Sequence, residues 1–144
     1  MIYKTIRDLV GHRALQHVAP DTTVVEACRR LRAGRVGALG VCDGGALVGI
    51  VSERDVIGAI AREGGSGGDA PVREIMTPDP VTIDIEASLA EAQECMKRGG
   101  FRHLPVTDAG GVVTILSFRE IPTDYRLMHE RFAEYRGEDA LAAS

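Results

Sequence analysis

The sequence predicts an α+β fold built from two copies of one β-α-β-β-α unit. Two observations carry this prediction: the chain matches itself at a fixed offset, and each copy shows helical and strand patterns in the same order. Residues 18–56 align with residues 83–121 without a gap, at an offset of 65 positions. Because an ungapped match through strands, turns and helix starts rarely arises by chance, we interpret it as an internal duplication.

Identical residues are spread over the whole aligned range and are not confined to one element. The identical pairs are Glu26 and Glu91, Ala27 and Ala92, Gly34 and Gly99, Leu39 and Leu104, Val41 and Val106, Asp43 and Asp108, Gly45 and Gly110, Val48 and Val113, Ile50 and Ile115, Ser52 and Ser117, and Arg54 and Arg119. Upstream of the repeat, IRDLV at 6–10 resembles VREIM at 72–76, with the register moved by one residue.

Each copy begins with an extended segment and a helix. The extended segments cover residues 16–19 and 81–84. The helices are predicted because apolar residues recur at helical spacing. These residues are Val24, Ala27, Cys28 and Leu31 in the first copy, and Leu89, Ala92, Cys95 and Met96 in the second. Capping residues precede both helices, and Gly34 or Gly99 is expected to close them.

The second half of each copy is a hairpin followed by another helix. The strands are GALGV and LVGIV in the first copy, and RHLPV and VVTIL in the second. The turns CDGG and TDAGG contain glycines that supply positive φ angles. Leu104 and Val106 are expected to point inward, and Pro105 suggests an edge strand with no partner for its amide position. Ser52 and Ser117 start the last helices, and Pro122 interrupts the second of them.

These elements divide the chain into four segments. We assign residues 1–63 to the first copy, 64–71 to a flexible glycine-rich linker, 72–122 to the second copy and 123–144 to a C-terminal helix with a frayed end. In this tail, Thr123 is a candidate cap, and an apolar stripe follows it. The stripe consists of Tyr125, Met128, Phe132 and Tyr135. It is equally suited to packing on its own domain and to a dimer contact.

Composition and charge exclude several classes of function. With 44% hydrophobic and 26% charged residues, the chain can form a core and stay soluble. A net charge of −4 argues against a nucleic-acid partner. No stretch is long and apolar enough for a membrane span or signal peptide, so we expect a cytoplasmic protein. The three cysteines and four histidines show no metal-ligand spacing, and no nucleophile–base pattern indicates an enzyme.

With this order of elements, and with MTPDPVTI, FRHLPVTDAGG and GIVSERD in their places, the chain resembles a tandem pair of CBS (cystathionine-β-synthase) domains. The resemblance covers residues 6–121. It implies that the two units pack through their sheets around a pseudo-twofold axis and leave two clefts, which commonly take AMP, ADP or ATP, and sometimes NAD(P)H or S-adenosylmethionine. It also implies a stand-alone member that forms a disc-shaped homodimer, parallel or antiparallel.

Ser52 and Asp55 allow two interpretations. From the residues alone they form a capping box, in which Ser52 binds a first-turn amide and the Asp55 carboxylate offsets the helix dipole. The resemblance implies in addition that Asp55 accepts both ribose hydroxyls of a nucleotide, while Ser52 lies beside the ribose and phosphate. Hydrogen bonds to a carboxylate are strong enough for such a role, and the two roles can coexist.

The residues before LPV also allow two interpretations. Arg102 and His103 are either a solvated strand end and a surface histidine, or a basic pair that binds phosphate. The resemblance implies that they reach the phosphate of the nucleotide held by the other repeat's aspartate. It further implies that His17 and Val18 form the adenine-side wall of the same cleft.

The second cleft is expected to be degenerate. The residues that correspond to the basic pair are Gly37 and Ala38, which carry no cation. Opposite them stand Ser117 and Glu120, where the longer glutamate replaces the aspartate. We therefore expect one competent nucleotide cleft per chain.

The function that follows is that of a non-enzymatic regulatory module. It would bind AMP or ATP as a ligand, with no required cofactor, and transmit binding through a homodimer or to an effector protein. The alternative from another class is a ligand-free dimerisation scaffold, in which Ser52 and Asp55 act only as caps. A further alternative is that the cleft binds NAD(P)H or S-adenosylmethionine.

Overall fold

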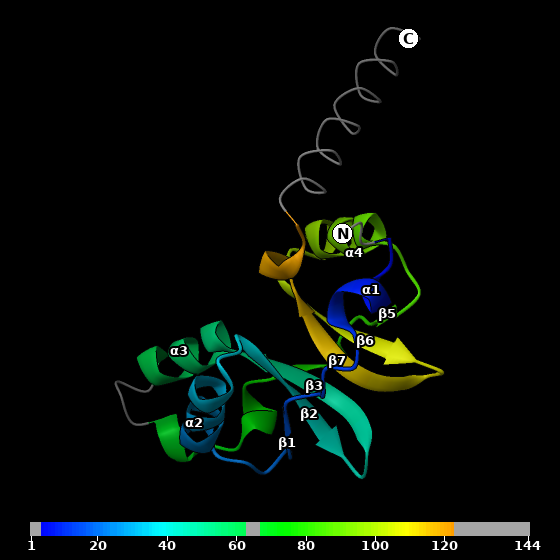
Figure 1. Ribbon diagram of the computed structural model, residues 1–144. Helices are drawn as coiled ribbons and strands as arrows, with labels where there is room; N and C mark the ends of the chain where they lie inside the picture. The colour runs from blue at the N-terminus through cyan, green and yellow to red at the C-terminus, as the bar shows by residue number, and fades with distance from the viewer. Residues whose placement is uncertain (1–3, 63–66, 123–144) are drawn as a thin grey trace, which may run out of the picture.

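The computed structural model describes residues 4–62 and 67–122 (Figure 1). These residues form two sheets, each flanked by its own helices, and the strands of the two sheets meet along β7 (Gly111–Ser117). The α+β class and the two repeats are therefore confirmed. The predicted C-terminal helix falls in residues 123–144, outside the described residues.

Each repeat follows the predicted order of elements as far as the last helix. The first repeat contains β1 (His17–Val18), α2 (Val24–Gly34), β2 (Ala38–Asp43), β3 (Ala46–Ser52) and α3 (Glu53–Arg62). The second contains β5 (Ile83–Asp84), α4 (Leu89–Gly99), β6 (His103–Asp108), β7 and the 3-10 turn η3 (Phe118–Glu120). The second repeat thus has one short turn where the first has a helix. Pro122, which lacks an amide hydrogen, follows this turn, so an α-helical hydrogen bond back to Phe118 cannot form.

The long helices of the two repeats begin at residues that cap them. Thr23 accepts a hydrogen bond from the Glu26 amide at 3.2 Å, and Ser88 accepts one from the Glu91 amide at 3.0 Å. Gly34 and Gly99 are the last helical residues, but neither is the left-handed residue that ends the helix. That conformation is taken by the next residue, which is Arg35 (φ 52°) in one repeat and Gly100 (φ 72°) in the other.

The two sheets differ in their outer edge. The first has the order β1-β2-β3-β4, in which β4 (Thr77–Pro78) pairs antiparallel with β3. The second has the order β5-β6-β7. In both sheets the first strand is parallel to its neighbour and the hairpin carries a bulge at the equivalent position. Apart from β4, the two sheets therefore have the same topology.

The prediction of an edge strand at Pro105 is wrong. β6 is the central strand of its sheet, and Pro105 is buried. In the first repeat the equivalent Gly40 donates its amide to the Gln16 carbonyl at 3.0 Å. Proline cannot make this bond, and accordingly β5 begins pairing one position later, with Ile83 opposite Val106. The proline shifts the two-residue parallel ladder by one position and does not exclude β6 from the interior of the sheet.

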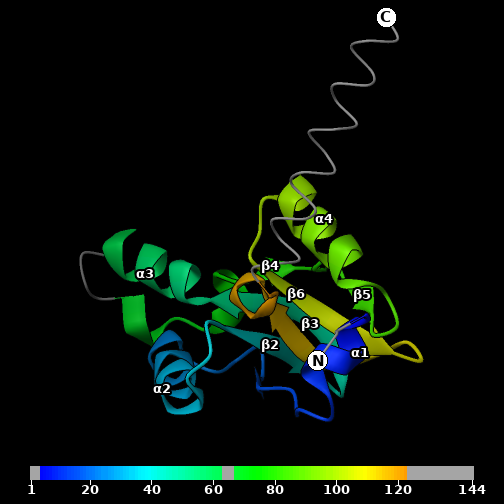
Figure 2. The same ribbon diagram turned by 45° about the horizontal axis from the view of Figure 1, so that its top comes forward.

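The segment that precedes each repeat packs on the other repeat. Helix α1 (Ile6–Val10) lies beside the second sheet and α4 in both views (Figures 1 and 2), and Ile6 is fully buried in that core. In the same way, Val72 of the turn η2 (Val72–Glu74) is buried in the core of the first repeat. Backbone hydrogen bonds follow the same exchange. The Ile6 amide donates to the Ala87 carbonyl at 2.9 Å, and the Val72 amide donates to the carbonyl of the equivalent residue, Thr22, at 2.8 Å.

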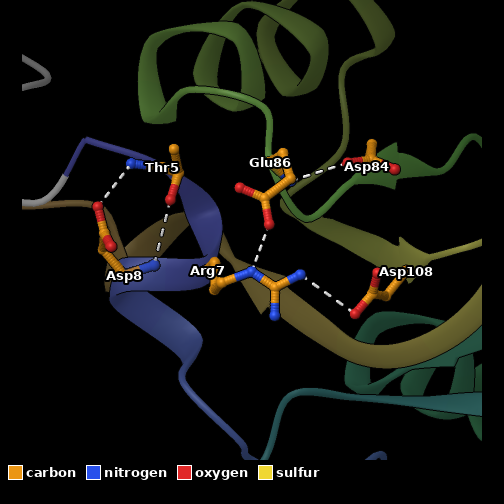
Figure 3. A network of polar contacts seen from close by, with 6 residues as sticks. All are labelled: Thr5, Arg7, Asp8, Asp84, Glu86 and Asp108. Carbon is orange, nitrogen blue, oxygen red and sulfur yellow. Dashed lines mark hydrogen bonds and ion pairs between the residues drawn. The ribbon is translucent and has the colours of Figure 1, made fainter.

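Surface ion pairs also join the segment before each repeat to the other repeat. Arg7 of α1 pairs with Glu86 and, at 3.2 Å, with Asp108 of the second repeat (Figure 3). At the equivalent positions, Arg73 of η2 pairs with Asp21 of the first repeat. The start of α1 is fixed by a capping box between Thr5 and Asp8, which Figure 3 also shows. The two repeats are consequently held together by exchanged segments as well as by their sheets.

The described part of the linker, residues 67–71, packs on the first repeat. Residues Gly67–Asp69 form the 3-10 turn η1, which packs on α2 and α3. The Val24 amide donates to the Ala70 carbonyl at 2.8 Å, and Pro71 bridges to Thr23. The glycine-rich sequence therefore predicted the connection between the repeats but not the turn at its end.

Candidate functional site

Ser52 and Asp55 form a complete capping box at the start of α3. The Asp55 Oδ2 atom accepts bonds from the Ser52 amide at 2.8 Å and from the Ser52 hydroxyl at 3.1 Å. In return, the Asp55 amide donates to the Ser52 hydroxyl at 3.3 Å. Within residues 4–62 and 67–122, the second oxygen, Oδ1, accepts no hydrogen bond. The capping interpretation is thus realised with one carboxylate oxygen, and the other makes no hydrogen bond to the described residues.

Ser117 and Glu120 form the equivalent box in the second repeat, but its carboxylate is fully engaged. Glu120 Oε2 accepts from the Ser117 amide at 3.0 Å and from Arg13 Nη2 at 3.0 Å. Glu120 Oε1 accepts from Arg13 Nη1. The longer acidic side chain therefore extends to a guanidinium from the opposite end of the described chain, and both of its oxygens are used.

His103 lies between the two repeats. A Cβ atom built on Gly37 would lie 2.8 Å from the Nε2 atom of His103, so the imidazole rests directly on the first repeat. Burial lowers the pKa of His103 below its ordinary value of 6.5, and the nearby carboxylates of Glu53 and Glu120 partly oppose this shift. A histidine of the second repeat is thereby placed next to Glu53, the first residue of the helix that Ser52 and Asp55 cap.

Arg102 is exposed and is held through its backbone. Its carbonyl accepts the Phe118 amide at 2.8 Å, as the Gly37 carbonyl accepts the Glu53 amide at 3.0 Å in the first repeat. Its charge is close enough to His103 to affect the pKa of the imidazole. Within residues 4–62 and 67–122, the Arg102 side chain makes no hydrogen bond to Ser52 or Asp55. The structure thus brings His103 to the first repeat and leaves the Arg102 side chain in solvent.

Three other predicted site residues lie on the first two strands of the sheet that carries Ser52. Val18 is 4% exposed and belongs to the core of the first repeat, so its side chain does not form an open wall. His17 is exposed on β1, which β2 separates from β3 and Ser52. Ala38 is buried and pairs with Ser52 across the β2–β3 ladder. The structure thus places one strand between His17 and Ser52 and packs Val18 in the core, and the adenine-side wall expected from these two residues stays a prediction.

Arg13 is the residue that sequence reasoning missed. It lies outside the aligned repeat, and 107 positions separate it from Glu120. One signal was present: Gly49, against which Met76 packs, corresponds to Thr114 in the second repeat. A Cβ at position 49 would meet the Met76 side chain, whereas the Thr114 hydroxyl accepts a hydrogen bond from Arg13 Nε at 3.2 Å.

Two shallow pockets lie near the meeting of the repeats. One, of about 370 Å³, lies between the hairpin tips and residues 79–82. The other, of about 300 Å³, lies between the segment joining α1 to β1 and strand β7, and Arg13 contributes to its lining. Ser52 and Asp55 line neither of these two pockets.

Neither a metal-ligand cluster nor a membrane-spanning helix occurs in the part of the chain that the structure describes. Residues 4–62 and 67–122 contain no group of three or more histidine, cysteine, aspartate or glutamate side chains arranged to hold a metal ion. In the same part of the chain, no helix combines the length and apolar character that a membrane span requires. Cys28, one of the apolar residues whose spacing predicted α2, is exposed on that helix.

Comparison with known proteins identifies the family. The model of the CBS domain matches residues 6–62 and 72–121. The CBS domain-containing protein CBSCBSPB5 of Arabidopsis thaliana is 36% identical over 141 residues, which cover 97% of this chain and 25% of the plant protein. This chain thus spans about a quarter of the length of its plant relatives.

Solved structures agree with this assignment. The CBS-domain containing protein ATU1752 from Agrobacterium tumefaciens superimposes with a TM-score of 0.77 at 32% identity, over 81% of this chain and 95% of that one. The CBS domain protein PAE2072 from Pyrobaculum aerophilum, solved in complex with AMP, has a TM-score of 0.77 at 25% identity, over 88% of this chain and 98% of that one. The duplicated unit, its topology and these matches lead to one conclusion: the chain belongs to the CBS domain family and contains a tandem pair of these domains.

Proposed function

We propose that the protein is a regulatory module that binds one adenine nucleotide, of the AMP, ADP or ATP class, at the Ser52–Asp55 box. The observation that carries this proposal is the difference between the two acidic residues. Asp55 uses one oxygen for the cap, whereas both oxygens of Glu120 are taken by Arg13 and Ser117. Within the described residues, Asp55 Oδ1 thus keeps both of its lone pairs for a ribose diol, whereas each oxygen of Glu120 already accepts from a protein donor.

The phosphate end of the nucleotide would be bound by the second repeat. His103 lies against Gly37, and Arg102 is exposed next to it. A guanidinium in solvent can turn toward an anion without first breaking a bond to protein, and its planar donors suit phosphate oxygens. The nucleotide would therefore contact both repeats at once, with its sugar on the first and its phosphate on the second.

A known structure supports the choice of ligand. The PAE2072 protein was solved in complex with AMP, and it shares the fold over most of both chains. A ligand that bridges two repeats stabilises one relative arrangement of them, because it binds that arrangement more tightly than others. Such a change could be passed on through a homodimer or to an effector protein in the cytoplasm. In this proposal the nucleotide is a signal and not a substrate.

Isothermal titration calorimetry with AMP and with ATP tests the proposal. We expect one site per chain in the unchanged protein and a loss of affinity of about tenfold or more in Asp55→Asn, which removes the charge from the diol acceptor. Glu120→Gln is the matched control, because it makes the same change in the second repeat, and we expect it to leave this affinity unchanged. Normal AMP affinity in Asp55→Asn would refute the assignment of the site.

One observation favours a second candidate function, that of a ligand-free scaffold. The Ser52–Asp55 box is satisfied without any ligand, as a purely structural cap would be. A ligand at 100 times its dissociation constant raises the free energy of unfolding by about 2.7 kcal/mol. A scaffold would show no such rise in its melting temperature with AMP, ATP, NADH or S-adenosylmethionine, so one set of melting curves separates the two functions and also tests the alternative ligands.

A further inference from the structure

The outer edge of the second sheet is covered by a side chain at the place where a strand covers the first. In the first sheet, β4 pairs with β3 at Gly49 and Ile50. The equivalent positions on β7 are Thr114 and Ile115. There Arg13 donates from Nε to the Thr114 hydroxyl at 3.2 Å and from Nη2 to the Ile115 carbonyl at 2.8 Å. The guanidinium thus binds one backbone carbonyl of this edge and the hydroxyl of the side chain before it.

The same guanidinium neutralises the acidic residue of the second repeat. Arg13 binds both Glu120 oxygens, in the two-pronged geometry that gives arginine–carboxylate pairs their strength. Both side chains are partly shielded, at 40% and 33% exposure. Four hydrogen bonds therefore hold Arg13 to three residues of the second repeat, and any ligand that needs the Glu120 carboxylate must displace it.

Space for a small molecule is present beside this contact. The pocket of about 300 Å³ has Arg13, His12 and Thr114 in its lining. Asp108 also lines it, but that carboxylate is paired with Arg7 at 3.2 Å. A hollow therefore lies beside Arg13, and the carboxylate in its lining, that of Asp108, is already engaged by Arg7. Glu120 itself is not among the lining residues.

We propose that Arg13 is a built-in blocking residue, which occupies the second nucleotide site and limits the chain to one nucleotide. This inference rests on the proposed function of the Ser52–Asp55 box. The inference also predicts which ligand the unblocked site would prefer, adenosine or AMP. Because Gly37 and Ala38 provide no cation for a phosphate, a second site freed of Arg13 and given an aspartate would bind the uncharged nucleoside adenosine at least as tightly as AMP.

Calorimetric titration with adenosine and AMP tests this in three proteins: the unchanged chain, Glu120→Asp, and Glu120→Asp combined with Arg13→Ala. Each is also made with Asp55→Asn, which weakens the first site. We expect one AMP per chain in the unchanged protein and no additional site in Glu120→Asp, since Arg13 remains. Removing Arg13 as well is expected to add one adenosine site per chain, and this site persists when Asp55 is replaced.

The outcomes separate the inference from the proposed function. Two nucleotides bound by the unchanged chain, or no gain of adenosine binding when Arg13 is removed, would overturn the blocking role. No AMP binding by the unchanged chain together with a new adenosine site in the double variant would reject the proposed function and support the blocking role. If the double variant does not fold, Arg13→Lys with Glu120→Asp replaces it. Lysine lacks the two-pronged geometry, and a partial gain of binding is then expected.

Discussion

His103 of the second repeat rests on Gly37 of the first, with its Nε2 atom 2.8 Å from the place where a Cβ of residue 37 would lie. This contact explains why the first repeat has a glycine where the second has Arg102. Any larger side chain at position 37 must displace the imidazole. Position 37 therefore shapes the interface between the repeats, in addition to lacking a cation for phosphate.

Gly37→Ala tests this relationship. The added methyl group is expected to push the His103 ring aside and to lower AMP affinity several-fold. The free energy of unfolding should change by no more than about 1 kcal/mol, because the cost of crowding a mobile ring is offset by the lower entropy of the unfolded chain. Calorimetry and urea unfolding measure the two effects.

Gly58→Ala is the control for that substitution. Gly58 lies inside α3, and its nearest side-chain atom, Arg62 Nη1, is 3.5 Å from the added Cβ, an ordinary contact. We expect a gain in stability of about 0.5–1 kcal/mol from the better helix former, with unchanged AMP affinity. Equal effects of the two alanines on binding would contradict a specific role for the Gly37–His103 contact.

Replacement of Asp55 separates its two roles. Asp55→Ala removes the bonds from the Ser52 amide and hydroxyl, and we expect the free energy of unfolding to fall by about 1 kcal/mol. Asp55→Asn keeps an oxygen that can accept the amide, so most of this stability should remain. AMP affinity should fall in both variants, because both lack the charge. Chemical denaturation measures the change in stability, and titration measures the change in AMP affinity. An asparagine variant that binds AMP normally would show that Asp55 acts only as a helix cap.

The attachment of α1 to the second repeat should depend more on packing than on charge. Ile6 is fully buried, and Ile6→Ala is expected to lower the free energy of unfolding by about 2–5 kcal/mol. Arg7 forms its ion pairs at the surface (Figure 3), where solvent and salt screen them. Arg7→Ala should therefore have a much smaller effect, which shrinks further in 1 M salt. A larger loss in Arg7→Ala than in Ile6→Ala would show that the ion pairs are the main anchor.

Stability should depend on pH through His103. Burial lowers the pKa of the folded imidazole below its ordinary value of 6.5. Below that value the unfolded chain takes up the proton more readily than the folded one, so the free energy of unfolding is highest above pH 6.5 and falls as the pH drops toward the folded pKa. His103→Gln should flatten this part of the profile. His12→Gln, in the exposed segment after α1, controls for the loss of one imidazole, and an equal flattening there would contradict the assignment to His103.

Much of the fold could be predicted because its signals are local. The spacing of apolar residues and the caps at Thr23, Ser88 and Ser52 depend on residues within one or two turns. The duplication extended these local predictions, since each element could be checked against its copy. Leu104 and Val106 face the core as expected, and the Ser52–Asp55 box forms with the predicted partners.

What the sequence by itself determined is thus the repeated unit, the order of its elements and the family to which it belongs. The tertiary structure decided which residues meet across the two repeats. Arg13 reaches Glu120 over 107 positions, Ile6 packs in the core of the other repeat, and His103 rests on Gly37. The physical reason is that such contacts depend on how two complete units pack, and the spacing of residues along the chain carries no record of that arrangement.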